Sequence, residues 1–299
     1  MGAGGNFSRT GAWTHAAGRI LLFLALFIGF LVAGSPLLAG EQDTARFMAL
    51  SSAVTLTAAL GAGAIVITRF DGRRFGAVGF AWTGSTVREI AVGLALGVGS
   101  IALVTAALAV TGAIGFAGQA GNAAAWAAAV GAHFGLLALA AAAEEALFRG
   151  YAFQALSRAT GPVVAVVATS VAFAFAHGGN PGANGIALLN IFLAGALLAA
   201  AYLRTRSLWF ATAVHVGWNW GMASLLDLPV SGLDLLDTPL YEPSVGGPAW
   251  LTGGPFGPEG GLAGTLAFAI ALAAVLRWPG LEEAPAMRAL RPLVDTEEA

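Results

Sequence analysis

The chain contains eight predominantly apolar stretches, each close to the length that crosses a lipid bilayer. A spanning helix needs about 20 apolar residues, and inside lipid its backbone polar groups must pair within the helix. Only 10% of the residues are charged, whereas soluble domains carry about 25%, so soluble, disordered and fibrous proteins are excluded. We therefore predict an all-α, polytopic membrane bundle with spans at about 19–39, 47–68, 89–113, 127–156, 162–179, 185–203, 207–226 and 262–278.

The basic residues predict how this bundle is oriented. All 14 are arginines, and positive charge concentrates in cytoplasmic loops. With eight spans, only Arg46 lies on the other side, where the largest loop, 227–261, holds carboxylates and no basic residue. We predict cytoplasmic tails at 1–18 and 279–299 around one transmembrane domain at 19–278. The cytoplasmic arginines would be Arg9, Arg19, Arg69, Arg73, Arg74, Arg88, Arg158, Arg204, Arg206, Arg277, Arg288 and Arg291.

Two further features concern how the spans pack. The fourth span exceeds 25 residues, so it must tilt, kink near Gly131 or Gly135, or run partly along the membrane surface. Pairs of glycines four residues apart occur at 93/97, 131/135 and 217/221, and such pairs permit close helix packing. Loop 227–261 is too apolar for a simple linker, and we expect a cap or a re-entrant segment.

Composition also limits the chemistry. There is no cysteine and no lysine, which excludes disulfides, thiolate metal sites, cysteine nucleophiles and Schiff bases. A formal net charge of −2 predicts no nucleic acid partner.

The few polar residues inside the spans are the candidate site, because buried ionisable groups in membranes are costly and usually functional. Glu145 and Arg149 are four residues apart, so they share a helix face and can pair. Glu144 points about 100° away and has no obvious cation, which leaves it free to act as a general base or acid. The same spans also contain His177, His215 and Asn219.

Helix rise predicts that these groups meet at one depth. At about 1.5 Å per residue, Glu144 lies about 21 Å from Arg158, and His177 lies about 22 Å from Pro162, across a short loop. Asn219 reaches the same level from Arg206, and His215 is expected one turn shallower. His133 and the aromatic residues of these spans are expected to be packing residues.

Three motifs appear in order on successive polar spans: E-E-x-x-x-R at 144–149, F-x-x-x-H at 173–177 and H-x-x-x-N at 215–219. Together they resemble the CAAX protease and bacteriocin-processing (CPBP, or Abi) family of intramembrane endopeptidases, in particular its bacterial branch. The resemblance covers about residues 125–260, and the stretch LTGGPFGPEGG adds to it.

The resemblance implies a role for each residue. Glu144 and His177 would activate the attacking water, and His215 and Asn219 would stabilise the tetrahedral oxyanion. The supporting positions would be Glu145, Arg149 and Phe173.

A zinc-dependent alternative remains open, because one glutamate and two histidines have the composition of a catalytic zinc site. If zinc bound Glu144, His177 and His215, the base would have to be Glu145, which is expected to pair with Arg149. A metal-independent glutamate mechanism is therefore favoured over a metalloprotease.

The expected substrate is a membrane protein or peptide that reaches a polar cavity within the bilayer. Arginine-only, alanine- and glycine-rich usage suggests a GC-rich bacterium, hence a multi-pass protein of the bacterial inner membrane. Two other classes stay open: a non-catalytic family member that acts as a scaffold or in peptide immunity, and a transporter or proton relay.

Overall fold

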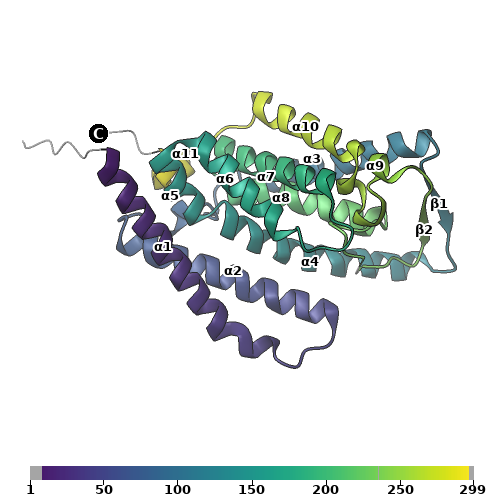
Figure 1. Cartoon of the computed structure of the whole chain (residues 1–299), viewed down its shortest axis with the longest axis horizontal. Coiled ribbons are helices and arrows are strands. Elements are labelled where there is room, and N and C mark those ends of the chain that lie inside the picture. Colours follow the sequence, from purple (N-terminus) through teal and green to yellow (C-terminus); the bar gives the residue numbers. More distant parts are fainter. Residues whose placement is uncertain (1–8, 235, 296–299) are drawn as a thin grey trace, which may run out of the picture.

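The computed structural model describes residues 9–234 and 236–295, which form a helical bundle with one small two-stranded sheet at one end (Figure 1). Strand β1 (Ile114–Gly118) pairs antiparallel with β2 (Tyr241–Val245), with Ile114 opposite Val245. The α-helices are α1 (Arg9–Gly34), α2 (Thr44–Arg69), α3 (Thr86–Val110), α4 (Ala123–Phe148), α5 (Tyr151–Thr160), α6 (Pro162–Ala176), α7 (Gly185–Thr205), α8 (Leu208–Trp220), α9 (Ala249–Thr252), α10 (Leu262–Arg277) and α11 (Pro285–Leu290).

The predicted all-α polytopic membrane architecture is confirmed. Among the described residues, five helical segments are long and apolar enough to cross a membrane: 14–38, 44–69, 86–110, 123–160 and 185–205. The predicted fifth and eighth spans are the shorter apolar helices α6 and α10, and α8 continues as a π-helical turn at Gly221–Leu225. Helices α1 and α11 extend into the predicted tails, and residues 1–8 and 296–299 lie outside the described part of the chain.

The long fourth span breaks at a different place from the one expected. Helix α4 runs without interruption through Gly131 and Gly135 and ends at Phe148, so a kink near either glycine is wrong. The chain turns at Gly150 and continues as the amphipathic helix α5. A Cβ atom on Gly150 would lie 2.2 Å from the carbonyl oxygen of Ala146, so this sharp turn requires glycine.

Helices α3 and α8 pack closely through two of the predicted glycine pairs. A Cβ on Gly97 would lie 2.3 Å from the backbone oxygen of Val214, and one on Gly217 would lie 2.5 Å from that of Leu94. At Gly131 and Gly135 an added Cβ would meet nothing within 4 Å. Thus the 93/97 and 217/221 pairs bring two backbones together, and the 131/135 pair does not.

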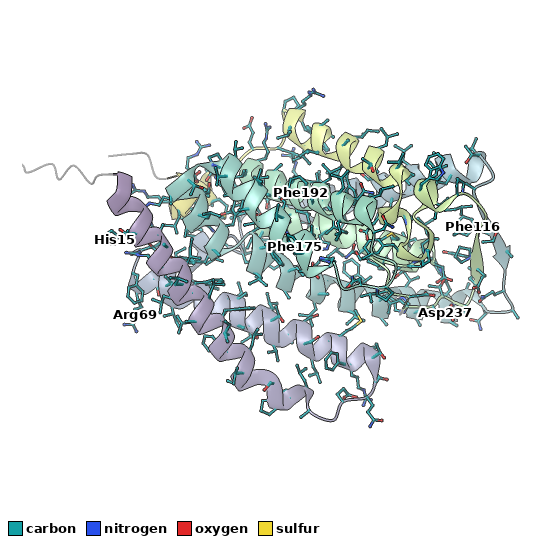
Figure 2. The ribbon with its side chains drawn as sticks, viewed as in Figure 1. His15, Arg69, Phe116, Phe175, Phe192 and Asp237 are labelled. Atoms are coloured by element: carbon teal, nitrogen blue, oxygen red, sulfur yellow. The ribbon has the colours of Figure 1, made fainter. Side chains whose placement is uncertain are left out.

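The arginine-bearing loops gather at one end of the bundle. Asp71 is bonded to Arg19 and accepts a hydrogen bond from Tyr151 Oη at 2.8 Å. Arg206 pairs with Asp295 at 2.6 Å, which brings the α7–α8 turn to the C-terminal segment. Figure 2 shows Arg69 at this end and Phe116 and Asp237 at the opposite end. The α2–α3 and α7–α8 connections and the C-terminal segment therefore lie at the same end of the bundle (Figure 1).

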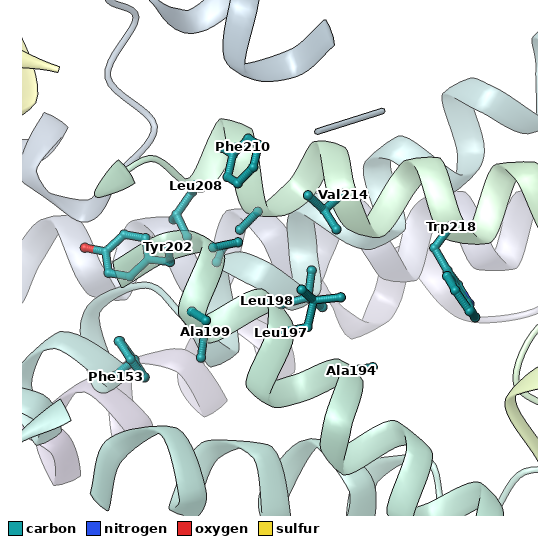
Figure 3. Close-up of a cluster of buried hydrophobic side chains, with 14 of the residues drawn as sticks. Phe153, Ala194, Leu197, Leu198, Ala199, Tyr202, Leu208, Phe210, Val214 and Trp218 are labelled. Atoms are coloured by element: carbon teal, nitrogen blue, oxygen red, sulfur yellow. The ribbon is translucent and has the colours of Figure 1, made fainter. Parts of the chain in front are cut away.

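Apolar side chains lie both inside and outside the bundle. Figure 3 shows the interior between α7 and α8, where Leu197, Leu198 and Val214 meet. The outer faces carry strongly exposed apolar residues such as Phe175 and Val163, which are 77% and 75% exposed. Large apolar patches of this kind are unusual on soluble monomers and fit a surface that faces lipid.

Candidate active site

Three side chains from three helices converge near the middle of the bundle. Glu144 comes from α4, His177 follows the last residue of α6, and His215 lies on α8. Glu144 Oε2 is 4.0 Å from His177 Nε2 and 3.8 Å from His215 Nε2. This oxygen is buried and makes no hydrogen bond within the described chain. It therefore lies between two imidazole nitrogens and is free to accept a hydrogen bond.

Glu145, the neighbour of Glu144, holds the surrounding groups in place. Its Oε1 accepts hydrogen bonds from Arg149 Nη1 at 2.9 Å and from His215 Nδ1 at 3.0 Å. Arg149 also donates to the backbone oxygen of Gly195 on α7 at 3.0 Å. The side chains of Glu145 and Arg149 are fully buried. The predicted i,i+4 pair is therefore present, and it also connects α4 to α7 and α8.

Phe173 packs among the polar groups of the site. The Arg149 guanidinium lies 4.5 Å from the centre of its ring, within the range of a cation–π interaction. The His177 ring lies 4.6 Å from the same ring, and the backbone oxygen of Phe173 accepts a hydrogen bond from His177 Nδ1 at 2.8 Å. Phe173 thus buries the arginine and fixes the orientation of His177.

These contacts restrict the tautomers of both histidines. Because a carbonyl oxygen can only accept, His177 Nδ1 carries a proton, and Nε2 of the neutral ring is then an acceptor facing Glu144. His215 Nδ1 faces a carboxylate instead. If the His215 ring is protonated, both of its nitrogens carry a hydrogen. Nδ1 then donates to Glu145, and Nε2 is a second donor.

Asn219 lies one turn beyond His215, where two cavities meet. A cavity of about 500 Å³ extends between α3, α7, α8 and α10, and another of about 610 Å³ contains Glu144 and opens toward residues 228–236. Three residues line both: His177, Asn219 and Ser231. The first cavity is mainly apolar away from this junction, with Ile191, Leu197, Leu198, Val214 and Phe268 in its wall.

The four predicted catalytic residues lie around the junction of the two cavities. His215 was expected one turn shallower than Glu144, and its side chain nevertheless approaches Glu144 as closely as that of His177 does. Depth was counted from Arg158 along a continuous helix, and the turn at Gly150 separates α5 from α4. His133 lies away from this cluster, with its Nδ1 3.3 Å from Ser224 Oγ.

Sequence reasoning missed a second carboxylate beside the site. Glu259, grouped above with the loop acids, is 3% exposed and lines the apolar cavity near His177 and Asn219. Its carboxylate accepts hydrogen bonds from Trp218 and Ser231. The available signal was that Glu259 is the one charged residue in the glycine- and proline-rich stretch LTGGPFGPEGG.

Glu144, His177 and His215 have the residue types of a catalytic zinc site. Among the described residues, no three His, Asp or Glu side chains form a group that could hold a metal ion. The remaining nitrogen of each histidine is held by Phe173 or Glu145. Glu145 Oε1 is bonded to Arg149 and His215.

The motifs fall within the part of the chain that resembles a known family. Residues 125–221 match a family described as type II CAAX prenyl endopeptidase Rce1-like. No curated protein and no solved structure matches the chain. The matched segment contains Glu144, Glu145, Arg149, His177, His215 and Asn219. Over residues 125–221, the chain is therefore similar to the Rce1-like family of type II CAAX prenyl endopeptidases.

Proposed function

We propose that this protein is an intramembrane endopeptidase that hydrolyses a peptide bond in a membrane-associated protein or peptide. The observation that carries the proposal is the buried, unbonded Oε2 of Glu144 between the Nε2 atoms of His177 and His215. A base of this kind, with hydrogen-bond donors beside it, is what hydrolysis of an amide requires. The family that residues 125–221 match, described as type II CAAX prenyl endopeptidase Rce1-like, supports the same reaction class.

Each residue has a role in this proposal. Glu144 takes a proton from water while the water oxygen forms a bond to the carbonyl carbon. His177 Nε2, oriented through Phe173 O, accepts a hydrogen bond from that water. The oxyanion is stabilised by the Nε2–H of His215 and the amide of Asn219. Glu144 then gives its proton to the amide nitrogen, and the C–N bond breaks.

Glu145 and Arg149 act on this reaction through His215. The carboxylate of Glu145 orients the imidazole from Nδ1, and Nε2 is a donor when the ring carries both protons. Arg149 balances the negative charge of Glu145 in a dry environment. The two residues are therefore supporting groups rather than reacting ones.

The cavities support a substrate with an apolar side chain near the scissile bond. The peptide would lie where the two cavities meet, at His177, Asn219 and Ser231. The wall formed by Ile191, Leu197, Leu198, Val214 and Phe268 favours an apolar group on one side of that bond, because burying such a group is worth about 1.5–3 kcal/mol.

The experiment compares liposomes that hold wild-type protein with liposomes that hold the Glu144→Gln variant. Peptides and small proteins extracted from the membranes of the cells that express the protein are added, and new peptide termini are identified by mass spectrometry. We expect cleavage only with wild-type protein. Absence of cleavage by wild-type protein contradicts the proposal, and a proton flux abolished by the same substitution would favour a proton relay instead.

A further inference from the structure

Glu259 lies outside the three motifs, yet it is bonded to residues on two sides of the proposed site. Its Oε1 accepts a hydrogen bond from Trp218 Nε1 at 2.8 Å. Its Oε2 accepts bonds from Ser231 N at 2.8 Å and from Ser231 Oγ at 2.6 Å. No arginine pairs with it among the described residues, and these three donors supply the hydrogen bonds of the buried carboxyl group.

The network continues to the turn that carries His177. Ser231 O accepts a hydrogen bond from Asn180 Nδ2 at 2.8 Å, and Asn180 lies three residues after His177. Asn190 on α7 donates to the backbone oxygens of Glu259 and Gly261 at 2.7 and 2.8 Å. The short helical turn Pro258–Gly260, which holds Glu259, is therefore fixed to α7, to α8 and to the chain that follows α6.

The bond to Trp218 is one of several that hold helix α8 near Asn219. The helix is only 13 residues long, and its hydrogen bonding changes to a π-helical turn after Trp220. Its contact with α3 is made through glycines, and Trp220 Nε1 donates to Val130 O on α4 at 2.9 Å. The indole of Trp218 holds the helix on the side of Glu259, and Asn219 is the next residue.

We infer that Glu259 is a positioning residue, which sets Asn219 through Trp218 and the His177 turn through Ser231 and Asn180. The inference rests on the proposed function, because it concerns the geometry of the same reaction. Glu259 need not touch the substrate for this role. Displacement of a reacting group by about 1 Å can lower turnover about 100-fold, so a residue that sets this geometry is expected to affect kcat strongly.

The test is a double-mutant cycle on the reconstituted protein, with cleavage of one identified peptide as the assay. The variants are Glu259→Gln, Asn219→Ala and the two combined. In Gln one of the two carboxylate oxygens becomes an NH2 group, which cannot accept the bonds that Trp218 donates to Oε1 or that Ser231 donates to Oε2. We expect Glu259→Gln to lower kcat by about 10- to 100-fold and to leave KM within about twofold.

The combined variant separates positioning from a general loss of structure. If Glu259 acts through Asn219, the two losses are not additive, and adding Glu259→Gln to Asn219→Ala should lower kcat by no more than about threefold. Losses that multiply, or a wild-type kcat in Glu259→Gln, overturn the inference. A wild-type protein that cleaves no peptide overturns the proposed function as well, so the two failures are distinguishable.

Two more variants keep the test decisive if Glu259→Gln does not fold. Trp218→Phe removes the indole donor to Oε1 and part of the ring that packs on Phe268. It is expected to show the same kcat loss and the same non-additivity with Asn219→Ala. Thr169→Val is the control, because Thr169 Oγ1 donates to the backbone oxygen of Ala165 at 2.9 Å and has no bond to the Glu259 network. A kcat loss in Thr169→Val as large as that in Trp218→Phe also overturns the inference.

Discussion

Two adjacent glutamates on α4 meet opposite surroundings. The side chain of Glu144 is 34% exposed, whereas that of Glu145 is fully buried and bonded to Arg149 and His215. Neighbouring helical residues point about 100° apart, so one carboxylate faces the cavity and the other faces the interior. Neutralising Glu144 should therefore mainly lower turnover, and neutralising Glu145 should mainly lower stability.

Glu144→Gln is expected to lower turnover by at least about 10²-fold, because it removes the proposed base, and to leave the melting temperature near that of the wild type. Glu145→Gln is expected to destabilise the fold by about 3–5 kcal/mol, the typical cost of leaving one member of a buried ion pair unpaired. Peptide cleavage and thermal unfolding in detergent measure both effects. Near-normal turnover by Glu144→Gln would show that the two roles are assigned wrongly.

Asn219→Ala and the response to a chelator distinguish the glutamate mechanism from the zinc-dependent one. In the glutamate mechanism, Asn219→Ala should lower turnover by about 10²–10³-fold, as the loss of an oxyanion donor does. Dialysis against a chelator should leave wild-type activity intact, measured together with metal content. One equivalent of zinc, lost with activity on chelation and restored with it, would replace the glutamate mechanism by a metal-dependent one.

At the scale of helices, the site depends on how closely α8 approaches α3. The glycines at 93, 97, 217 and 221 remove the side chains that would keep these helices apart. Backbones in contact gain dispersion and weak hydrogen-bonding energy, which drives helix association in lipid. His215 and Asn219 are on α8, so the position of this helix also sets the position of the proposed oxyanion donors.

Gly97→Ala is expected to push α8 away, because the new methyl group would lie 2.3 Å from Val214 O. Overpacking of this kind costs about 1–3 kcal/mol, and activity should fall with stability. Gly131→Ala is the matched control, since its methyl group would meet nothing within 4 Å; it should be neutral or slightly stabilising in a helix. Equal melting temperatures for the two variants would show that the close contact is unimportant.

At the scale of the molecule, the two ends of the bundle differ in charge. Ion pairs of Arg19, Arg158 and Arg206 lie at the end where the α2–α3 and α7–α8 connections meet the C-terminal segment. The opposite end contains the small sheet and the carboxylate-bearing segment 227–245 (Figure 1). Because arginine-rich ends remain in the cytoplasm, this asymmetry predicts the orientation in the membrane.

Single cysteines can test this orientation, since the chain has no native cysteine. A membrane-impermeant maleimide should label Gly246→Cys from outside the cell and Gly84→Cys only in inverted vesicles. Both glycines are exposed and have open space where a Cβ would be, so neither change should disturb the fold. Labelling of Gly246→Cys from the cytoplasmic side alone would contradict the predicted eight-span arrangement.

The sequence alone determined the features that depend on neighbouring residues. Apolar runs specified most of the helices, because in lipid each span must satisfy its own backbone. The Glu145–Arg149 pair followed from helical spacing, and the order of the motifs pointed to a resemblance that the match of residues 125–221 supports. Only the tertiary structure decided the turn at Gly150, the contact of His215 with both glutamates, and the burial of Glu259 against Trp218 and Ser231. Those contacts join residues 28 to 71 positions apart, and helical periodicity relates side chains only within a turn or two; the rest depends on where the helices cross.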